Sequence, residues 1–186
     1  MQFAIIDCGT NTFHLMIAEK KSSGETKVIY KTKTVVKLGE GGILSNKILP
    51  VPFERGLNAL GGFRKTIDDH QVKNVTAYGT AALRNAKNGK DFIHEAWVRH
   101  QIKPDLITGS REAELIYKGV CMAVPFEKGI SLIMDIGGGS TEFILCNEKD
   151  ILWKKSFKAG AALMLEKFHP SDPLSVSELK SINKWH

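Results

Sequence analysis

The feature that most constrains the fold is a short pattern that occurs twice in the 186-residue chain. Ile5–Thr12 reads IIDCGTNT and Ile133–Ser140 reads IMDIGGGS, so the two segments align without a gap. Each has two apolar residues, then an aspartate, a glycine two positions after it, and a final hydroxyl side chain. A duplicated domain explains this repeat most simply, with the second copy starting near residue 130.

The segments around the first pattern predict an α/β unit. Apolar, β-branched runs bounded by turn residues predict three strands, at Phe3–Cys8, Thr12–Glu19 and Lys27–Lys37. Apolar spacing and turn signals then predict, in alternation, a helix from Phe53 to about His70, a strand Val72–Tyr78, a helix Asp91–His100, a strand Pro104–Thr108 and a helix capped by Ser110. This βββαβαβα order combines an antiparallel meander with crossovers over a parallel part, which is typical of the ribonuclease-H-like fold.

After the second pattern the same order begins again. The sequence predicts strands at Ser131–Asp135, Thr141–Cys146 and Ile151–Phe157, a helix at Ala159–Phe168 and one short helical segment at Val176–Trp185. The later strands of a complete copy are not predicted. We therefore expect domains at residues 1–125 and 126–186, the second one incomplete, and a chain that is a fragment of a longer protein.

The strongest chemical motif is the glycine-rich segment Asp135–Thr141. Glycines without Cβ atoms let the backbone approach an anion and direct its N–H groups at it, and the hydroxyls add donors. Asp135 at a strand end can bind a divalent cation such as Mg²⁺. A tight hairpin is the structural alternative. Asp7–Thr12 repeats the design, and two such loops facing each other would bind successive phosphates, with the candidate residues Thr10, Asn11, Thr12, Gly137, Gly138, Gly139, Ser140 and Thr141.

The chain carries a formal net charge of +6, with basic clusters at Lys27–Lys37 and Lys149–Lys158. A positive field attracts nucleic acid, nucleotides and polyphosphate alike, and a lysine-rich solvated surface would give the same count. The basic residues are not interleaved with aromatic residues in a recognisable pattern. We therefore expect no nucleic-acid partner.

Other residue patterns exclude several classes. Cys8, Cys121 and Cys146 form no CxxC pair and the histidines form no zinc motif, so we expect three buried thiols and no zinc site. The apolar run Phe3–Ile6 meets Asp7 at once, unlike a secretion signal. No window has the roughly 20 apolar residues of a membrane span. The sequence predicts a cytoplasmic protein with no membrane partner.

Four blocks together resemble the exopolyphosphatase and guanosine pentaphosphate phosphohydrolase family, within the superfamily of sugar kinases, actin and 70-kilodalton heat-shock proteins. They are Asp7–His14, Gly79–Asn88, Ile107–Glu114 and Asp135–Glu142, and a weaker block follows at Leu38–Gly41. The middle two blocks distinguish this family from the kinases and chaperones. Cys8 stands where the family usually has an aliphatic residue, and Arg111 where many members have an acid.

The resemblance implies an activity and a site. Members hydrolyse terminal phosphoanhydride bonds of inorganic polyphosphate or guanosine pentaphosphate, with Mg²⁺ or another divalent cation, in a cleft between two ribonuclease-H-like (actin-like ATPase) domains. Carried onto this chain, Glu112 is the general base that activates water and Arg84 contacts a phosphoryl oxygen. Asp7, Asp135 and Glu142 are the candidate ligands of the metal, with Gly137 at the phosphates.

Alternatives remain at this point. Paired phosphate loops also occur in ATP-dependent kinases and chaperone-like ATPases of the same superfamily. A non-catalytic module that binds polyphosphate or a nucleotide is a third interpretation. Residue by residue, Glu112 could simply favour a helix N-terminus, Arg84 could be a solvated loop residue and Glu142 an exposed strand acid. A homodimer is a further expectation, because an incomplete second domain would expose apolar surface.

Overall fold

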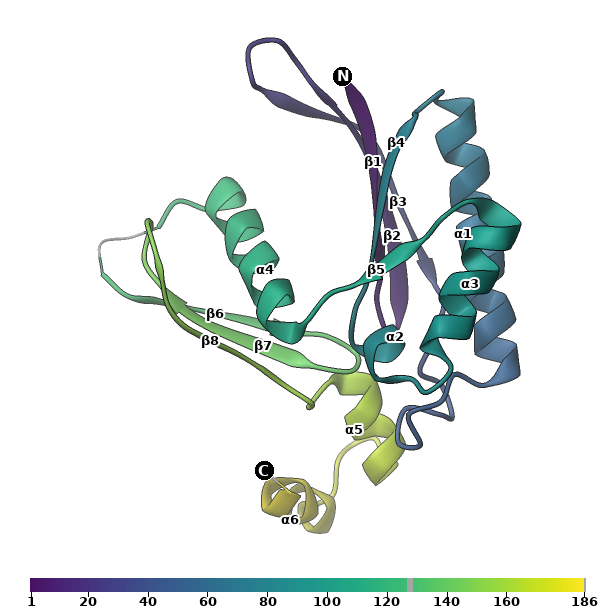
Figure 1. The fold of residues 1–186 in the computed structure, drawn as a ribbon. Coiled ribbons are helices and arrows are strands. Elements are labelled where there is room, and N and C mark those ends of the chain that lie inside the picture. The colour runs from purple at the N-terminus through teal and green to yellow at the C-terminus, as the bar shows by residue number, and fades with distance from the viewer. Residues whose placement is uncertain (127–128, 186) are drawn as a thin grey trace.

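The computed structural model describes residues 1–126 and 129–185 and contains two separate sheets (Figure 1). The first sheet has five strands in the order β3-β2-β1-β4-β5. Their bounds are β1 Gln2–Cys8, β2 Thr12–Lys20, β3 Thr26–Val35, β4 Asn74–Gly79 and β5 Pro104–Leu106. The pairs β1–β2 and β2–β3 are antiparallel, whereas β1–β4 and β4–β5 are parallel. This is the predicted ribonuclease-H-like α/β arrangement, which the structure confirms.

Helices cover one face of the first sheet. The long helix α1 (Pro50–Asp69) and α3 (Gly89–His100) lie side by side on the same side of this sheet (Figure 1). They approach closely at Gly56, where an added Cβ would lie 2.8 Å from the Phe92 ring. The helices bury their apolar stripes against alternate residues of the central strands, because successive strand residues point to opposite faces.

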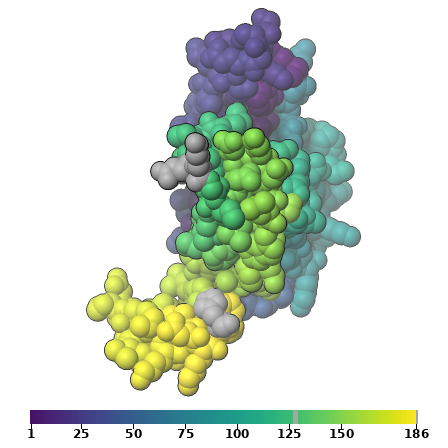
Figure 2. Space-filling model, turned by 90° about the vertical axis from the view of Figure 1, so that its left-hand side faces the viewer, coloured from purple at the N-terminus to yellow at the C-terminus, as the bar shows by residue number. Residues whose placement is uncertain are grey.

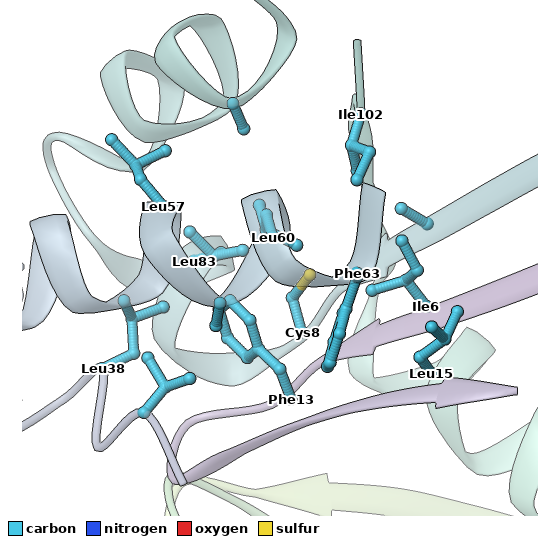
Figure 3. Close-up of a cluster of buried hydrophobic side chains, with 14 of the residues drawn as sticks. Ile6, Cys8, Phe13, Leu15, Leu38, Leu57, Leu60, Phe63, Leu83 and Ile102 are labelled. Atoms are coloured by element: carbon cyan, nitrogen blue, oxygen red, sulfur yellow. The ribbon is translucent and has the colours of Figure 1, made fainter. Parts of the chain in front are cut away.

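The main hydrophobic core lies between these helices and the sheet (Figure 3). Ile6 of β1, Leu15 of β2 and Leu57 of α1 are all fully buried in it. Phe13 and Phe92 meet edge to face with ring centroids 6.3 Å apart. Burial of each such side chain contributes roughly 1.5 to 3 kcal/mol, so the first sheet is a rigid base for the loops at its edge.

The second sheet repeats the first three strands of the first one. Its order is β6-β7-β8, with bounds β6 Ser131–Ile136, β7 Thr141–Cys146 and β8 Ile151–Phe157, and both pairs are antiparallel. Ile136 pairs with Thr141 just as Cys8 pairs with Phe13, so the repeat seen in the sequence has the same strand register. The domain boundary between residues 125 and 126 stays a prediction.

One face of the second sheet packs against α4 (Gly109–Ala123). Ala113 and Tyr117 of this helix form a small buried cluster with Ile144 and Cys146 of β7. Two short helices, α5 (Ala161–Phe168) and α6 (Val176–Trp185), follow β8. The C-terminal segment forms a lobe beside the rest of the molecule (Figure 2), and α6 buries none of its described residues.

Apart from shifts of one to three residues at the ends of elements, the structure differs from the sequence prediction in three places. A five-residue helix, α2 (Ala81–Asn85), follows β4 and was not predicted, because so short a segment shows no helical period. The cap of α4 is Thr108 and not Ser110, since the Thr108 side chain accepts a hydrogen bond from the Arg111 N–H. Cys121 is exposed, whereas Cys8 and Cys146 are buried as predicted.

Among the described residues, no helix has both the length and the apolar character needed to cross a membrane.

Candidate active site

The two glycine-containing loops, Gly9–Asn11 and Gly137–Ser140, meet directly. A Cβ atom built on Gly139 would lie 2.8 Å from Thr10 Oγ1, and one built on Gly138 would lie 3.1 Å from Thr10 Cβ. A side chain at either position would require the Thr10 side chain to move, whereas glycine requires no movement. The second loop therefore needs more glycines than the first because the Thr10 side chain occupies the space between them.

Each loop also contains the same tight turn. A Cβ on Gly9 would lie 2.7 Å from the Thr12 carbonyl oxygen, and one on Gly137 would lie 3.1 Å from the Ser140 carbonyl oxygen. In the second loop the Gly137 N–H donates to this Ser140 carbonyl at 2.9 Å. The repeated sequence pattern thus encodes a repeated turn. In the second loop the hydrogen bond of the Gly137 N–H lies within that turn.

Helix α5 holds the second loop from behind. Its first N–H groups, on Ala161 and Ala162, donate to the carbonyls of Gly137 and Gly138, each at 2.9 Å. Gly160 lies so close that a Cβ there would be 2.3 Å from the Gly138 carbonyl carbon. These bonds satisfy donors that a helix N-terminus otherwise leaves unpaired, and they hold the carbonyls of Gly137 and Gly138 at the start of α5.

One open pocket of about 610 Å³ lies at the meeting of the two loops. Eleven of the twelve predicted site residues other than Arg84 line it, and the exception is Thr141. The eleven are Asp7, Thr10, Asn11, Thr12, Glu112, Asp135, Gly137, Gly138, Gly139, Ser140 and Glu142. The Thr141 hydroxyl instead donates to the Ala159 carbonyl, so this side chain supports the loop. Arg84 lies behind Glu112, outside this pocket.

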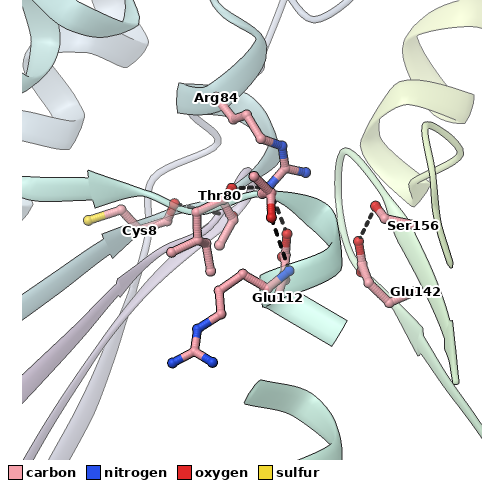
Figure 4. Close-up of polar contacts among 9 residues, drawn as sticks. Cys8, Thr80, Arg84, Glu112, Glu142 and Ser156 are labelled. Carbon is pink, nitrogen blue, oxygen red and sulfur yellow. Dashed lines mark hydrogen bonds and ion pairs between the residues drawn. The ribbon is translucent and has the colours of Figure 1, made fainter. Parts of the chain in front are cut away.

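Glu112 lies in the first turn of α4 and faces the pocket. Arg84, on α2, donates from Nη1 to Glu112 Oε2 at 2.9 Å and from the same atom to the Ile107 carbonyl at 2.9 Å (Figure 4). The pKa of Glu112 is raised to about 7, mainly by burial and also by the nearby Glu142 and Asp7 carboxylates, while the hydrogen bond and the charge of Arg84 oppose the rise. A carboxylate with a pKa near neutrality suits a general base.

Glu142 enters the pocket from β7 and is 1% exposed. Its Oε1 accepts a hydrogen bond of 2.6 Å from Ser156 Oγ on β8 (Figure 4). Asp135 is its register partner on β6. On the other side of the pocket, burial raises the pKa of Asp7, the His14 side chain lowers it, and Asp135 raises it. The carboxylates of both copies therefore interact across one pocket.

The pocket offers a divalent metal the carboxylates of Asp7, Asp135 and Glu142. Among residues 1–126 and 129–185, no three Asp, Glu, His or Cys side chains converge closely enough to form a complete metal cage. Mg²⁺ usually keeps several waters and binds one or two carboxylates together with substrate phosphates. The hard oxygen donors of Asp7, Asp135 and Glu142 fit a cation held in that way.

Sequence reasoning missed several residues of the pocket. His14, Thr80 and the first residues of α5 line it as well. Thr80 belongs to the block Gly79–Asn88 that the sequence analysis identified. It lines the pocket directly before α2, a helix that the sequence did not predict. Ala161 and Ala162 carry no polar side chain, so no sequence signal identified them; their contribution is made by the backbone.

The molecule thus has a ribonuclease-H-like first sheet and a second sheet that repeats its first three strands, and the glycine loops of the two meet over a carboxylate-lined pocket. Comparison with known protein families identifies the family of the chain. The chain belongs to the Ppx/GppA phosphatase family, whose model matches residues 16–186.

Individual relatives agree with this assignment. The chain is 38% identical over 179 residues to the bifunctional 3-dehydroquinate synthase/phosphatase of Fusobacterium nucleatum, with 92% of this chain and 27% of the relative covered. It is 35% identical over 182 residues to the guanosine-5'-triphosphate,3'-diphosphate pyrophosphatase of Pseudoalteromonas translucida, with 98% and 36% covered. The crystal structure of an exopolyphosphatase from Cytophaga hutchinsonii superposes with a TM-score of 0.96 at 40% identity, covering all of this chain and 59% of that one. The chain thus spans less than two thirds of each of these relatives.

Proposed function

We propose that this protein hydrolyses the terminal phosphoanhydride bond of inorganic polyphosphate or guanosine pentaphosphate. The observation that carries the proposal is the position of Glu112, a half-buried carboxylate with a pKa of about 7 that faces the pocket formed by two glycine loops. The names of the relatives, which include an exopolyphosphatase and a guanosine pentaphosphate pyrophosphatase, support the substrate class.

In the proposed reaction the terminal phosphate lies against the two loops. A water oxygen attacks its phosphorus, and the Glu112 carboxylate accepts the proton that the water loses. The bond between phosphorus and the bridging oxygen breaks, and the shortened chain leaves with that electron pair on its oxygen. Such reactions depend mainly on positioning and on stabilising negative charge, which loop donors and cationic side chains provide.

Arg84 has two roles in this proposal. Its Nη1 atom orients the Glu112 carboxylate through Oε2, which leaves Oε1 for the water. Its remaining donors lie beside the pocket and fit a phosphoryl oxygen, since guanidinium presents a planar fork. Thr10, Asn11, Thr12 and the Gly137–Ser140 loop would bind the phosphates.

Mg²⁺ would be held by one or two carboxylates of the set Asp7, Asp135 and Glu142. When bound, it neutralises charge on the phosphoryl oxygens. Ser156 keeps the Glu142 carboxylate turned toward the pocket through its 2.6 Å hydrogen bond.

Release of orthophosphate from polyphosphate and from guanosine pentaphosphate, with Mg²⁺ present, tests the proposal. Changing Glu112→Gln should lower turnover roughly 10²- to 10⁴-fold because the base is lost, while polyphosphate binding stays nearly intact. Glu95→Gln, a surface carboxylate of α3 paired with Arg99, is the matched control and should leave release unchanged.

Three other outcomes would contradict the proposal. Equal release by the Glu112→Gln and unchanged proteins would remove Glu112 from the role of base. Salt-sensitive polyphosphate binding without any release would indicate a binding module. Turnover of ATP above that of polyphosphate would indicate a kinase-like member of the superfamily.

A further inference from the structure

The helix α4, whose first turn carries Glu112, packs on the strand β8 of the second sheet (Figure 1). Two residues of this strand, Lys154 and Ser156, point to the same face, because alternate strand residues share a face. Their register partners on β7 are Ile144 and Glu142. Ile144 is fully buried in the cluster that β7 forms with α4, so this is the face that the helix covers. Lys154 and Ser156 therefore both face α4.

Ser156 contacts both the helix and a carboxylate of the candidate active site. A Cβ built on Gly109, the first residue of α4, would lie 2.5 Å from Ser156 Cβ. Ser156 Oγ also donates to Glu142 Oε1 at 2.6 Å (Figure 4). The strand β8 thus supports one pocket carboxylate through a hydrogen bond and the start of the helix that carries Glu112 through close packing.

Lys154 adds a charged contact further along the helix. Its Nζ atom donates to Glu114 Oε1, and Arg111 Nη1 donates to Glu114 Oε2 at 3.0 Å. These hydrogen bonds, of which the one from Lys154 is the larger cause, hold the pKa of Glu114 below its ordinary value, so the carboxylate is ionised at neutral pH. Among the residues that the structure describes, Glu114 and Lys154 form the one ion pair between α4 and the second sheet.

Glu112 and Glu114 leave the helix in nearly opposite directions, since two residues of an α-helix turn by roughly 200°. Glu112 lines the pocket of the candidate active site, and Glu114 meets β8. On the pocket side, Arg84 of the first copy donates to Glu112 and to the Ile107 carbonyl just before the helix. The start of α4 is therefore held from two sides. Loss of the contact with β8 can move the carboxylate on the opposite side.

We infer that Glu114 and Lys154 are positioning residues, which hold α4 on β8 so that the Glu112 carboxylate keeps its place in the pocket. This inference rests on the proposed function, because it takes Glu112 as the base. Neither Glu114 nor Lys154 is among the described residues that line that pocket, so both act through the helix. Base catalysis needs the carboxylate within hydrogen-bond reach of the water, and a displacement of about 1 Å can lower a rate about a hundredfold.

A direct contact between Lys154 and the substrate is the alternative, since this lysine lines an open hollow beside the pocket. A double-mutant cycle of Glu114→Gln and Lys154→Gln separates the two. Each single variant should lower kcat for orthophosphate release from polyphosphate roughly tenfold, with the Kd for polyphosphate changed less than about twofold. The double variant should lose no more than either single variant, because the pair is already broken.

Two further variants are the controls. Glu54→Gln breaks the ion pair with Arg99, which joins α1 to α3 away from the pocket, and should leave kcat unchanged. Lys154→Arg keeps the charge and should retain most of the turnover. Thermal unfolding of every variant shows whether the fold is intact, and Lys154→Arg keeps the comparison decisive if a glutamine variant folds poorly.

A second readout does not depend on hydrolysis. Titration of the Glu112 carboxyl by ¹³C NMR measures its pKa, which burial raises to about 7 and which the groups facing it modify, namely Arg84 from α2, Glu142 from β7 and Asp7 from β1. A Glu112 side chain that leaves its place gains contact with water, so its pKa should fall in both single variants and stay unchanged in Glu54→Gln. This shift without any orthophosphate release by the unchanged protein would reject only the proposed hydrolysis.

Three results would overturn the inference. The first is unchanged turnover together with an unchanged Glu112 pKa in both single variants. The second is a double variant whose loss of kcat equals the product of the two single losses, since the residues would then act independently. The third is weaker polyphosphate binding by Lys154→Gln with Glu114→Gln unaffected, which would make Lys154 a direct contact of the substrate.

Discussion

The two copies share the same first three strands and the same turn, yet their sheets differ in what covers them. Positions that match in strand register are Ile6 and Met134, each directly before the aspartate of its loop. Ile6 is fully buried, whereas Met134 is 54% exposed. Leu132 and Ile136, on the same face of β6, are exposed as well, while their counterparts Ala4 and Cys8 are buried.

The cause lies in the helices that follow the third strand. In the first copy, α1 packs its apolar stripe on this face of the sheet. In the second copy, α5 instead docks its first turn on the carbonyls of Gly137 and Gly138, and α6 buries none of its described residues. The glycine loop therefore keeps its shape through local bonds and through contact with the facing loop, and a covered sheet face is not needed for it.

The largest expected effect tests this comparison at the matched residues Ile6 and Met134. Ile6→Ala should lower the free energy of unfolding by about 2 to 5 kcal/mol, because it opens a cavity in a close-packed core. Met134→Ala removes a half-exposed side chain and should cost less than about 1 kcal/mol. Urea unfolding of the two variants checks this. Equal losses would mean that the second sheet face is covered in solution.

The next effect concerns the loop that the copies share. Gly160→Ala places a Cβ against the Gly138 backbone, so the loop must move, and pyrophosphate binding should weaken by about a hundredfold. Gly62→Ala, on α1 where nothing lies within 4 Å of the added atom, is the control and should preserve binding. Isothermal titration measures both. Unchanged binding in Gly160→Ala would separate loop position from phosphate affinity.

A smaller effect concerns pH. The base must be deprotonated to act, so the rate of phosphate release should rise with pH through a midpoint near 7, the pKa of Glu112. Arg84→Gln removes the hydrogen bond that lowers this pKa, so the midpoint should move to higher pH, with a several-fold loss of rate at pH 7 beyond any loss at the plateau. Rate profiles from pH 5 to 9 measure it. A midpoint that stays near 7 would exclude Arg84 as the group that tunes the base.

The smallest expected effect on stability comes from substitutions that test the predicted homodimer. If the exposed face of β6 drives self-association, Leu132→Ser with Met134→Ser should make the protein monomeric and change the free energy of unfolding by less than about 1 kcal/mol. Val28→Ser with Ile29→Ser, exposed apolar residues of β3, is the matched control. Sedimentation velocity distinguishes the two. Association retained in the β6 variant would assign the contact to another surface.

Much of this organisation was predictable from the chain. Strand runs are strong signals, and the predicted β6 to β8 differ from the observed strands by at most one residue at any end. The helix α2 was not predicted because five residues are too few to show a helical period. The hydrogen bond between Arg84, on this helix, and Glu112 was therefore not predicted either. The cap of α4 was assigned to Ser110 because the strand before it was predicted to continue to Thr108, whereas the observed β5 ends at Leu106 and leaves Thr108 as the cap.

The sequence by itself determined the duplicated unit, the two glycine loops and the identity of the acids that line the pocket, since these depend on residue type and on neighbours in the chain. Only the tertiary structure decided what those groups can do. The pKa of Glu112 depends on burial and on Arg84, 28 residues away in sequence. The close approach of Thr10 to Gly139 likewise joins residues that lie far apart in the chain. Separation along a sequence carries no information about desolvation or about the distance between charges in space.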